Sequence, residues 1–422
     1  MHQKKFAICR KYKDHKKMKI FLKENVWDAA IKRMNRLFDE FDNIVISTSG
    51  GKDSTIIMEL ALQVAEERNR LPMKLFFLDQ EAEYRMTIEY MRKIMADPRV
   101  EPIWLQVPIR LFNATSMDQP WLNCWQEDEE WMRDKEDISI KENVFGTDRF
   151  HKIFTNVLDY YFPDEKACYL AGVRAEESPS RLGGLTVDAT YKDITWAKRL
   201  TKAKEHFTFY PIWDWQMSDV WKAIHDHNWR YCKIYDELHR YGITPRNMRV
   251  SNLHHETAVH SLFFLHEIEP DTWNKLSKRL AGINQAKHMK KHEMFAVKTL
   301  PFMFKTWTEY RDYLTENLIT DEDHKKRFRR MWARQDDFYG DMAKSEDLTK
   351  RQIASILVND WEFVKLDGFL NHPAMIAYRD WRRGKIDARA RKKSNLIYIK
   401  PHLLRTTDER FFRTPRKRSQ VG

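Results

Sequence analysis

The chain has 422 residues, of which 42% are apolar and 32% charged, with only 12 Gly and 14 Pro. This composition excludes collagen-like, low-complexity and intrinsically disordered chains, and the length predicts two or three domains. No apolar run approaches the ~18–20 residues of a membrane-spanning helix, and the N-terminus lacks a signal-peptide stretch, so we expect a cytoplasmic protein. The four cysteines form no CxxC pair or Cys/His cluster, so neither an iron–sulfur cluster nor a structural zinc is expected.

The net charge of +12 is concentrated at the two ends of the chain. Residues 1–20 hold eight Lys or Arg against one Asp, and residues 379–422 hold fifteen against four acidic residues. We therefore expect a basic N-terminal arm over 1–22 and a basic tail over 379–422. Such ends are typical of chains that contact a polyanion, although solvated tails that only increase solubility are the alternative.

The apolar pattern predicts alternating helices and strands in the first half of the chain. A helix over 26–41 precedes a buried strand at 44–46, and then come a helix over 54–68, a strand at 75–78, a helix over 86–95 and a strand at 103–107. Further short strands are predicted at 168–171 and 207–210. This alternation indicates an α/β domain with a parallel sheet over 23–250. The acidic, aromatic segment 109–166 is expected to be an insertion or lid, and 251–378 a helical C-terminal domain.

A phosphate-binding loop is the strongest local signal. It runs Ser47-Thr-Ser49-Gly50-Gly51-Lys52-Asp53-Ser54-Thr, between the strand at 44–46 and the following helix. Two glycines let backbone N–H groups approach an anion, and the helix adds its unpaired N–H groups and the positive end of its dipole. The spacing fits neither GxxxxGK[ST] nor GxGxxG. The competing interpretation is a turn that merely caps the helix.

Three segments in order resemble one family. Ser49-Gly-Gly-Lys-Asp-Ser54 is similar to the SGGxDS loop of the PP-loop ATP pyrophosphatases and the related phosphoadenylyl-sulfate (PAPS) reductases. Gly172-Val-Arg174-Ala-Glu-Glu177-Ser178-Pro-Ser-Arg181 and Pro211-Ile-Trp-Asp-Trp215 followed by Asp219-Val-Trp221 resemble two further elements of the reductase branch. The basic ends and the helical second half resemble the DUF3440-type members of that branch, a group that includes the immunoglobulin-binding regulator A proteins.

The resemblance implies a doubly wound, mostly parallel sheet of the adenine nucleotide alpha hydrolase type, with an adenine nucleotide across the strand ends. It also implies which residues contact the nucleotide, ATP or a PAPS-like molecule: Ser47, Ser49, Gly50, Gly51, Lys52, Asp53, Ser54, Asp79, Glu81, Gly172, Arg174, Glu177 and Ser178. Lys52, Asp53, Arg174 and Arg181 are the implied catalytic residues, and Asp53 and Glu177 the implied Mg²⁺ ligands. Asp79 and Glu81 could equally be helix caps, and the 172–181 segment could be a surface helix start.

The sequence also departs from the reductases. Their chemistry needs a nucleophilic cysteine in a C-terminal ECGxH-like segment, and no cysteine follows Cys232. A conventional PAPS reductase is therefore not expected. His255-Glu-Thr-Ala-Val-His260 is not a zincin motif, because the two histidines are five residues apart and point away from each other on a helix.

Three functions are compatible with these residues. The first is an enzyme that cleaves ATP between the α and β phosphates and adenylates an acceptor, with nucleic acid as a possible acceptor. The second is a PAPS-binding transferase or reductase-like protein, and the third a regulatory protein whose binding to DNA, RNA or a protein partner depends on nucleotide. The expected nucleic-acid contacts lie in the basic tail: Arg391, Lys392, Lys393, Arg416, Lys417 and Arg418.

Overall fold

The computed structural model describes residues 22–366 except 114–115, 117–118, 187–188, 246, 252, 256–257, 287–298, 340–345, 359 and 364–365. The predicted nucleic-acid contacts of the basic tail and nearly all of the basic arm lie outside these residues.

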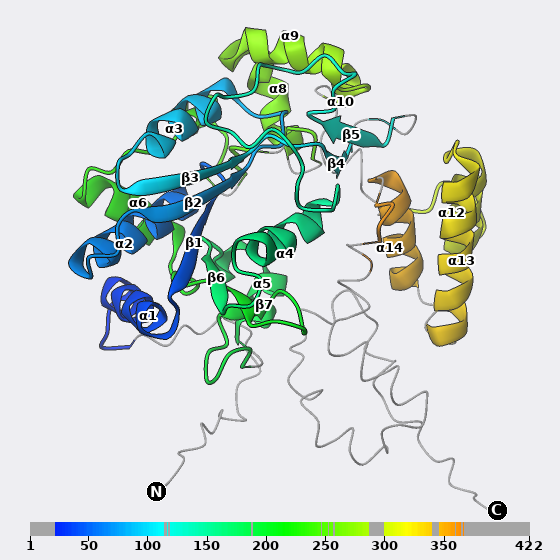
Figure 1. The fold of residues 1–422 in the computed structure, drawn as a ribbon. Coiled ribbons are helices and arrows are strands. Elements are labelled where there is room, and N and C mark those ends of the chain that lie inside the picture. The colour runs from blue at the N-terminus through cyan, green and yellow to red at the C-terminus, as the bar shows by residue number, and fades with distance from the viewer. Residues whose placement is uncertain are drawn as a thin grey trace, which may run out of the picture.

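A six-stranded sheet forms the centre of the molecule, in the order β3-β2-β1-β6-β8-β7 (Figure 1). The strands are β1 (Asn43–Thr48), β2 (Met73–Leu78), β3 (Val100–Leu105), β6 (Ala167–Leu170), β7 (Ala197–Arg199) and β8 (His206–Phe209). All neighbouring pairs are parallel except β7 and β8. The predicted α/β class and mostly parallel sheet are confirmed.

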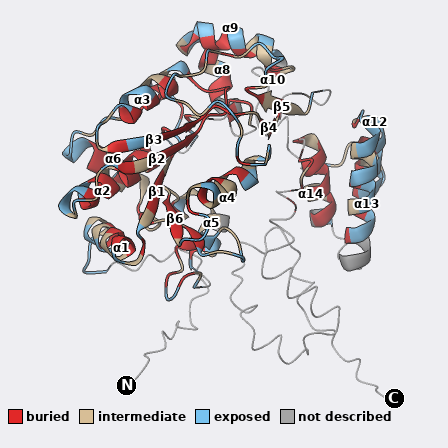
Figure 2. Cartoon of the chain, in the orientation of Figure 1, coloured by how far each residue is buried: buried red, intermediate tan, exposed pale blue. Residues whose placement is uncertain are grey.

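The sequences of the strands are largely apolar because both faces of the sheet are covered. Every residue of β6 is buried, as are five of the six in β2 (Figure 2). The helices that follow the strands are α2 (Lys52–Glu67), α3 (Arg85–Met95), α4 (Phe150–Tyr161), α5 (Pro179–Thr186) and α6 (Met217–Asp226), and α1 (Val26–Glu40) precedes β1. Burial on both faces is what parallel sheets require, so these helices are needed for the sheet to exist.

The segment 109–166 contains a two-stranded antiparallel hairpin and one helix. The hairpin pairs β4 (Ile109–Phe112) with β5 (Trp121–Cys124), and α4 packs its Phe154 ring against Phe76 and Tyr169 of the sheet. Trp125 is fully buried, so this aromatic residue of the segment packs in the interior.

The helical second half is divided between two hydrophobic cores. Its first helices are α7 (Ile234–Arg240), α8 (Val259–Ile268), α9 (Pro270–Arg279) and α10 (Ile283–Ala286), and their apolar residues join the core of the sheet. The next helices, α12 (Trp307–Asn317), α13 (Glu322–Tyr339) and α14 (Glu346–Leu357), share a separate core against which Phe112 and Trp121 of the hairpin pack. Among the described helices, none is long and apolar enough to cross a membrane.

Candidate functional site: a cavity at the carboxyl ends of β1 and β6

A cavity of about 460 Å³ opens where the strand order reverses. From β1 the chain proceeds outward through β2 and β3, whereas β6 lies on the other side of β1. Ligands of open α/β sheets bind in the crevice outside the carboxyl ends of the strands at such a switch point. The predicted phosphate loop follows β1 and the predicted Gly172–Arg181 element follows β6, so the topology brings both to this cavity.

Hydroxyl groups hold the phosphate loop in shape. The Ser54 hydroxyl donates to the Gly51 carbonyl at 2.8 Å and accepts from the Ser49 N–H at 3.3 Å, and the Thr48 hydroxyl accepts from the Gly50 N–H at 3.2 Å. Within the described part of the chain, no hydrogen bond uses the N–H of Asp53 or of Ser54. These are the groups that the first turn of a helix presents to an anion.

Two loop positions require glycine. Gly50 has φ +72°, and a Cβ there would lie 2.9 Å from the Thr87 methyl. A Cβ on Gly172 would lie 2.5 Å from the Asp53 carbonyl carbon and 2.8 Å from the Ser54 nitrogen. The loop after β6 therefore touches the backbone at the start of α2, and this close approach joins the two halves of the site.

A chain of ion pairs links the two loops across the cavity. Asp53 accepts from the Lys52 ammonium at 2.7 Å and from the Arg174 guanidinium, which is only 3% exposed and also donates to Glu176 at 3.0 Å. Arg174 is also the N-cap residue of a short 3-10 turn, Ala175–Glu177, and its N–H donates to the Glu177 carboxylate. Lys52 and Arg174 are thereby held beside the loop amides.

Two further guanidinium groups line the cavity, from Arg181 and Arg249. Arg181 pairs with Glu177, and burial together with the like charge of Arg249 lowers the Arg181 pKa. A second cation disfavours the charged form of its neighbour, so this part of the cavity attracts an additional anionic group.

Tyr235 of α7 is a site residue that the sequence analysis missed. Its fully buried hydroxyl accepts from the Lys52 N–H at 3.1 Å, and the Lys52 ammonium lies 5.6 Å from its ring centroid. Burial raises the Tyr235 pKa, so the hydroxyl stays neutral. A tyrosine 183 residues away from Lys52 carries no local sequence signal.

Most predicted contacts line the cavity, but four do not. Ser47, Ser49, Gly51, Lys52, Asp53, Ser54, Gly172, Arg174, Glu177 and Arg181 do. Gly50 lies behind the loop against Thr87, and the Ser178 hydroxyl accepts from the Arg181 N–H at 3.1 Å, as a cap of α5.

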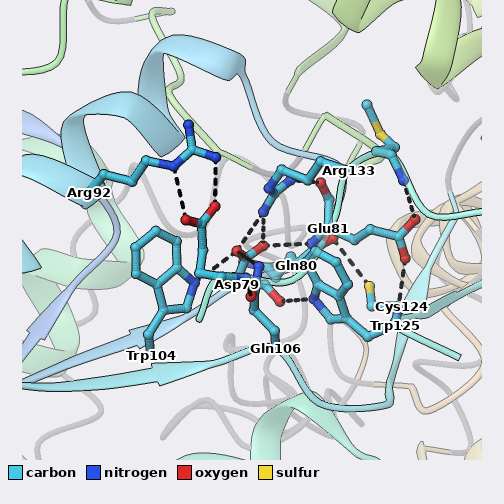
Figure 3. A network of polar contacts seen from close by, with 11 residues as sticks. Asp79, Gln80, Glu81, Arg92, Trp104, Gln106, Cys124, Trp125 and Arg133 are labelled. Carbon is cyan, nitrogen blue, oxygen red and sulfur yellow. Dashed lines mark hydrogen bonds and ion pairs between the residues drawn. The ribbon is translucent and has the colours of Figure 1, made fainter. Parts of the chain in front are cut away.

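The structure does not bring Asp79 and Glu81 to the cavity. Both are fully buried after β2, and Arg133 of the insertion pairs with Asp79, which also accepts from Trp104 and Gln106 at 2.9 Å (Figure 3). Glu81, at φ +62°, accepts from the Trp125 N–H at 2.8 Å and from the guanidinium of Arg279 at the end of α9. This network of polar contacts fastens the insertion and α9 to the sheet, while the neighbouring Gln80 lines the cavity.

The carboxylates at the cavity do not form a preassembled metal site. Within the described residues no group of three or more His, Cys, Asp or Glu could hold a metal ion. Both oxygens of Asp53 face cations, and Glu177 is paired with Arg181. The two predicted Mg²⁺ ligands thus do not fit the role as they stand.

None of the described cysteines provides a nucleophile here. Cys124, Cys168 and Cys232 are buried and absent from the cavity lining, and burial raises the pKa of each, that of Cys232 to about 11. A thiolate attack on a sulfonucleotide therefore has no candidate residue in the described part of the chain.

The order of the strands and the loop after β1 define a PAPS reductase-like, PP-loop fold. Residues 43–241 match the model of the phosphoadenosine phosphosulfate reductase domain, and residues 242–371 match DUF3440, a domain of unknown function. The chain therefore has the domain order of PAPS reductase-like proteins that carry a DUF3440 domain. It is similar to the uncharacterized protein YbdN of Escherichia coli K12, with 27% identity over 277 residues, which are 63% of this chain and 68% of YbdN.

Two solved structures that match this chain show distant likeness. FMN adenylyltransferase of Candida glabrata, in complex with FAD and inorganic pyrophosphate, has 15% identity and a TM-score of 0.31; the match covers 50% of this chain and 58% of that one. PAPS reductase of Candida auris, in a phosphate complex, has 13% identity and a TM-score of 0.27, over 51% of this chain and 92% of the reductase.

Proposed function

We propose that the cavity binds an adenine nucleotide with its β and γ phosphates on the loop 49–54. The observation that carries the proposal is the convergence of the free Asp53 and Ser54 amides with the cations Lys52, Arg174 and Arg181 around one cavity at the switch point. Phe150 and Phe154, four residues apart on α4, line the same cavity with Leu78 and offer an apolar wall for the base.

The reaction that this arrangement supports best is cleavage between the α and β phosphates. An acceptor oxygen forms a bond to the α-phosphorus, the bond from that phosphorus to the bridging oxygen breaks, and pyrophosphate leaves while the acceptor's proton passes to solvent. Lys52 and Arg174 stabilise the negative charge that develops on the departing pyrophosphate, because they are already oriented by Asp53. Catalysis by positioning and charge neutralisation needs no cysteine. We propose nucleic acid as the acceptor class, on the strength of the basic chain ends.

A sulfonucleotide such as PAPS is the second candidate ligand. The matched reductase domain favours it, and the Arg181–Arg249 pair offers a place for a further phosphate or sulfate group. In that case the protein binds the nucleotide for a transfer reaction or for regulation, since the described cysteines are buried away from the cavity.

Release of pyrophosphate from α-labelled ATP, with and without single-stranded or duplex oligonucleotides, tests the leading reaction. We expect release by the wild type and at least a 100-fold slower release by Lys52→Ala. Lys222→Ala is the matched control, because this lysine is 73% exposed and pairs only on the surface with Asp226. No release under any of these conditions, together with tight binding of PAPS, would favour the second candidate.

A further inference from the structure

α13 carries a row of three arginines on one exposed face. The helix turns Phe328, Trp332 and Gln335 into the second core, whereas Arg327, Arg330 and Arg334 are exposed. Steps of three and four residues keep the three arginines within about 60° around the helix. They line a groove of about 320 Å³, which we call the α13 groove, together with Met331, Glu362 and Phe363.

Two cations of the α13 groove, Arg327 and Arg330, differ from the other cations of the same helix. Lys325 pairs with Glu322 at 2.7 Å, Lys326 with Asp323 at 3.3 Å, and Arg329 with Glu316. By contrast, no hydrogen bond or ion pair joins Arg327 or Arg330 to any other residue that the structure describes.

The other groove residues leave this positive charge in place. Glu362, the carboxylate in the lining, is engaged by Arg149 at 3.6 Å, and Arg327 lies 5.4 Å from the centroid of the buried Phe363 ring. One side of α13 is therefore neutralised by acids of α13 and by Glu316 of α12, while Arg327 and Arg330 on the groove side keep their positive charge.

We infer that the α13 groove binds the phosphate backbone of a nucleic acid. The row is about 10.5 Å long, from a rise of about 1.5 Å per residue, and this length faces about three phosphates of one strand. Guanidinium groups hold phosphate oxygens through paired hydrogen bonds, which suits them to this task better than lysines. In the sequence, fifteen Lys or Arg over residues 379–422 follow the groove residue Phe363.

One helix end connects the groove to the nucleotide cavity. Arg149, the N-cap residue of α4, pairs with Glu362 of the groove, and the next residue, Phe150, lines the nucleotide cavity. A strand held on the α13 groove therefore lies next to an element of the reaction site. In this respect the inference rests on the proposed function, because it names nucleic acid as the class of acceptor and assigns it a binding face.

Oligonucleotide affinity of the full chain, measured by fluorescence anisotropy between 50 and 200 mM salt, tests the α13 groove. The probes are fluorescein-labelled 30-mers of mixed sequence, as single-stranded DNA, duplex DNA and single-stranded RNA, without nucleotide. Arg327→Gln/Arg330→Gln/Arg334→Gln is expected to bind at least 10-fold more weakly at 100 mM salt. When log affinity is plotted against log salt concentration, the slope for this variant should be shallower by about 2–3. Each lost phosphate contact reduces the magnitude of the slope by about 0.7–0.9.

The matched control is Lys325→Gln/Lys326→Gln/Arg329→Gln, which removes the same charge from the same helix and should change that slope by less than about 1. An equal loss in both variants would show that net charge alone matters and would overturn the inference. So would unchanged binding in the groove variant, or no binding of any probe by the wild type. Arg330→Gln alone, with an expected slope change of about 1, keeps the test open if a triple variant does not fold.

The result of the oligonucleotide-binding test can be separated from the result of the pyrophosphate-release test. Lys52→Ala should retain wild-type oligonucleotide affinity, because Lys52 lies in the other cavity. Intact oligonucleotide binding without pyrophosphate release would therefore contradict only the proposed reaction.

Discussion

At the scale of single residues, Gly172 decides whether the two halves of the site can meet. Its missing side chain leaves room for the Asp53 carbonyl, which would lie 2.6 Å from a Cβ. We expect Gly172→Ala to lower the free energy of unfolding by about 1–3 kcal/mol, as overpacking does, and to weaken nucleotide binding by displacing the start of α2. Urea unfolding and calorimetric titration measure the two effects.

Gly183 provides the control for that substitution. It lies inside α5, and a Cβ there would meet nothing within 4 Å. Gly183→Ala should leave stability unchanged or raise it by about 0.5–1 kcal/mol, because alanine is the better helix former. Equal effects of the two substitutions would contradict the role given to Gly172.

Which residues could be recognised from the sequence depended on how local their signal is. Lys52, Asp53 and Ser54 stand in one contiguous motif, so their place at a strand end was predictable. Asp79 was assigned to the nucleotide by the family resemblance, but its partner Arg133 is 54 residues away and pairs with it only in the folded chain. Tyr235 and Arg249 reach the cavity from the helical second half, which no spacing rule anticipates.

At the scale of elements, the insertion is fastened to β2 by a buried charge pair. Asp79 is fully buried and Arg133 only 16% exposed in its side chain. Arg133→Met leaves a buried carboxylate without its counter-ion, so the free energy of unfolding should fall by about 3–5 kcal/mol in urea denaturation.

Arg92 offers a matched comparison in the same region. Its partner is Glu136 of the insertion, at 2.7 Å, but its side chain is 53% exposed (Figure 3). Arg92→Met should therefore lower the free energy of unfolding by at most about 1 kcal/mol. Similar losses for both variants would show that burial of the Asp79 pair is not what holds the insertion.

The elements themselves followed the sequence pattern where they are long or fully buried. The predicted helices over 26–41, 54–68 and 86–95 and the strands of the parallel sheet are confirmed to within a few residues. The three-residue strand β7 and the hairpin β4–β5 were not predicted, because three or four residues carry too little periodicity to separate a strand from a loop. The second half was expected to form one helical domain, and only the structure shows that α8–α10 join the first core.

At the scale of the whole molecule, one buried histidine makes stability depend on pH. His254 is 3% exposed, and burial lowers its pKa to about 3, with a smaller contribution from His255. In the unfolded chain a histidine has a pKa near 6.5, so below that pH the unfolded state takes up a proton that the folded state refuses. The stability that neutral His254 contributes is thus fully present above pH 6.5 and is lost as the pH falls towards 3.

Comparison of urea unfolding at pH 7 and pH 5 measures this contribution. Between pH 7 and pH 5, the free energy of unfolding of the wild type should fall by up to about 2 kcal/mol more than that of His254→Leu. The dependence is at most about 1.4 kcal/mol per pH unit. His225→Gln is the control, since that side chain is 90% exposed. An identical pH dependence in wild type and His254→Leu would show that His254 is protonated equally in both states.

The central claim, that the loop after β1 receives the phosphates of an adenine nucleotide, is tested most directly by a crystal structure with α,β-methylene ATP. The account predicts β- and γ-phosphate oxygens within hydrogen-bond distance of the Asp53 and Ser54 amides and the Lys52 ammonium, with the base towards Phe150 and Phe154. A nucleotide bound with its phosphates away from residues 49–54, or a cavity that remains empty at saturating ligand, would contradict it.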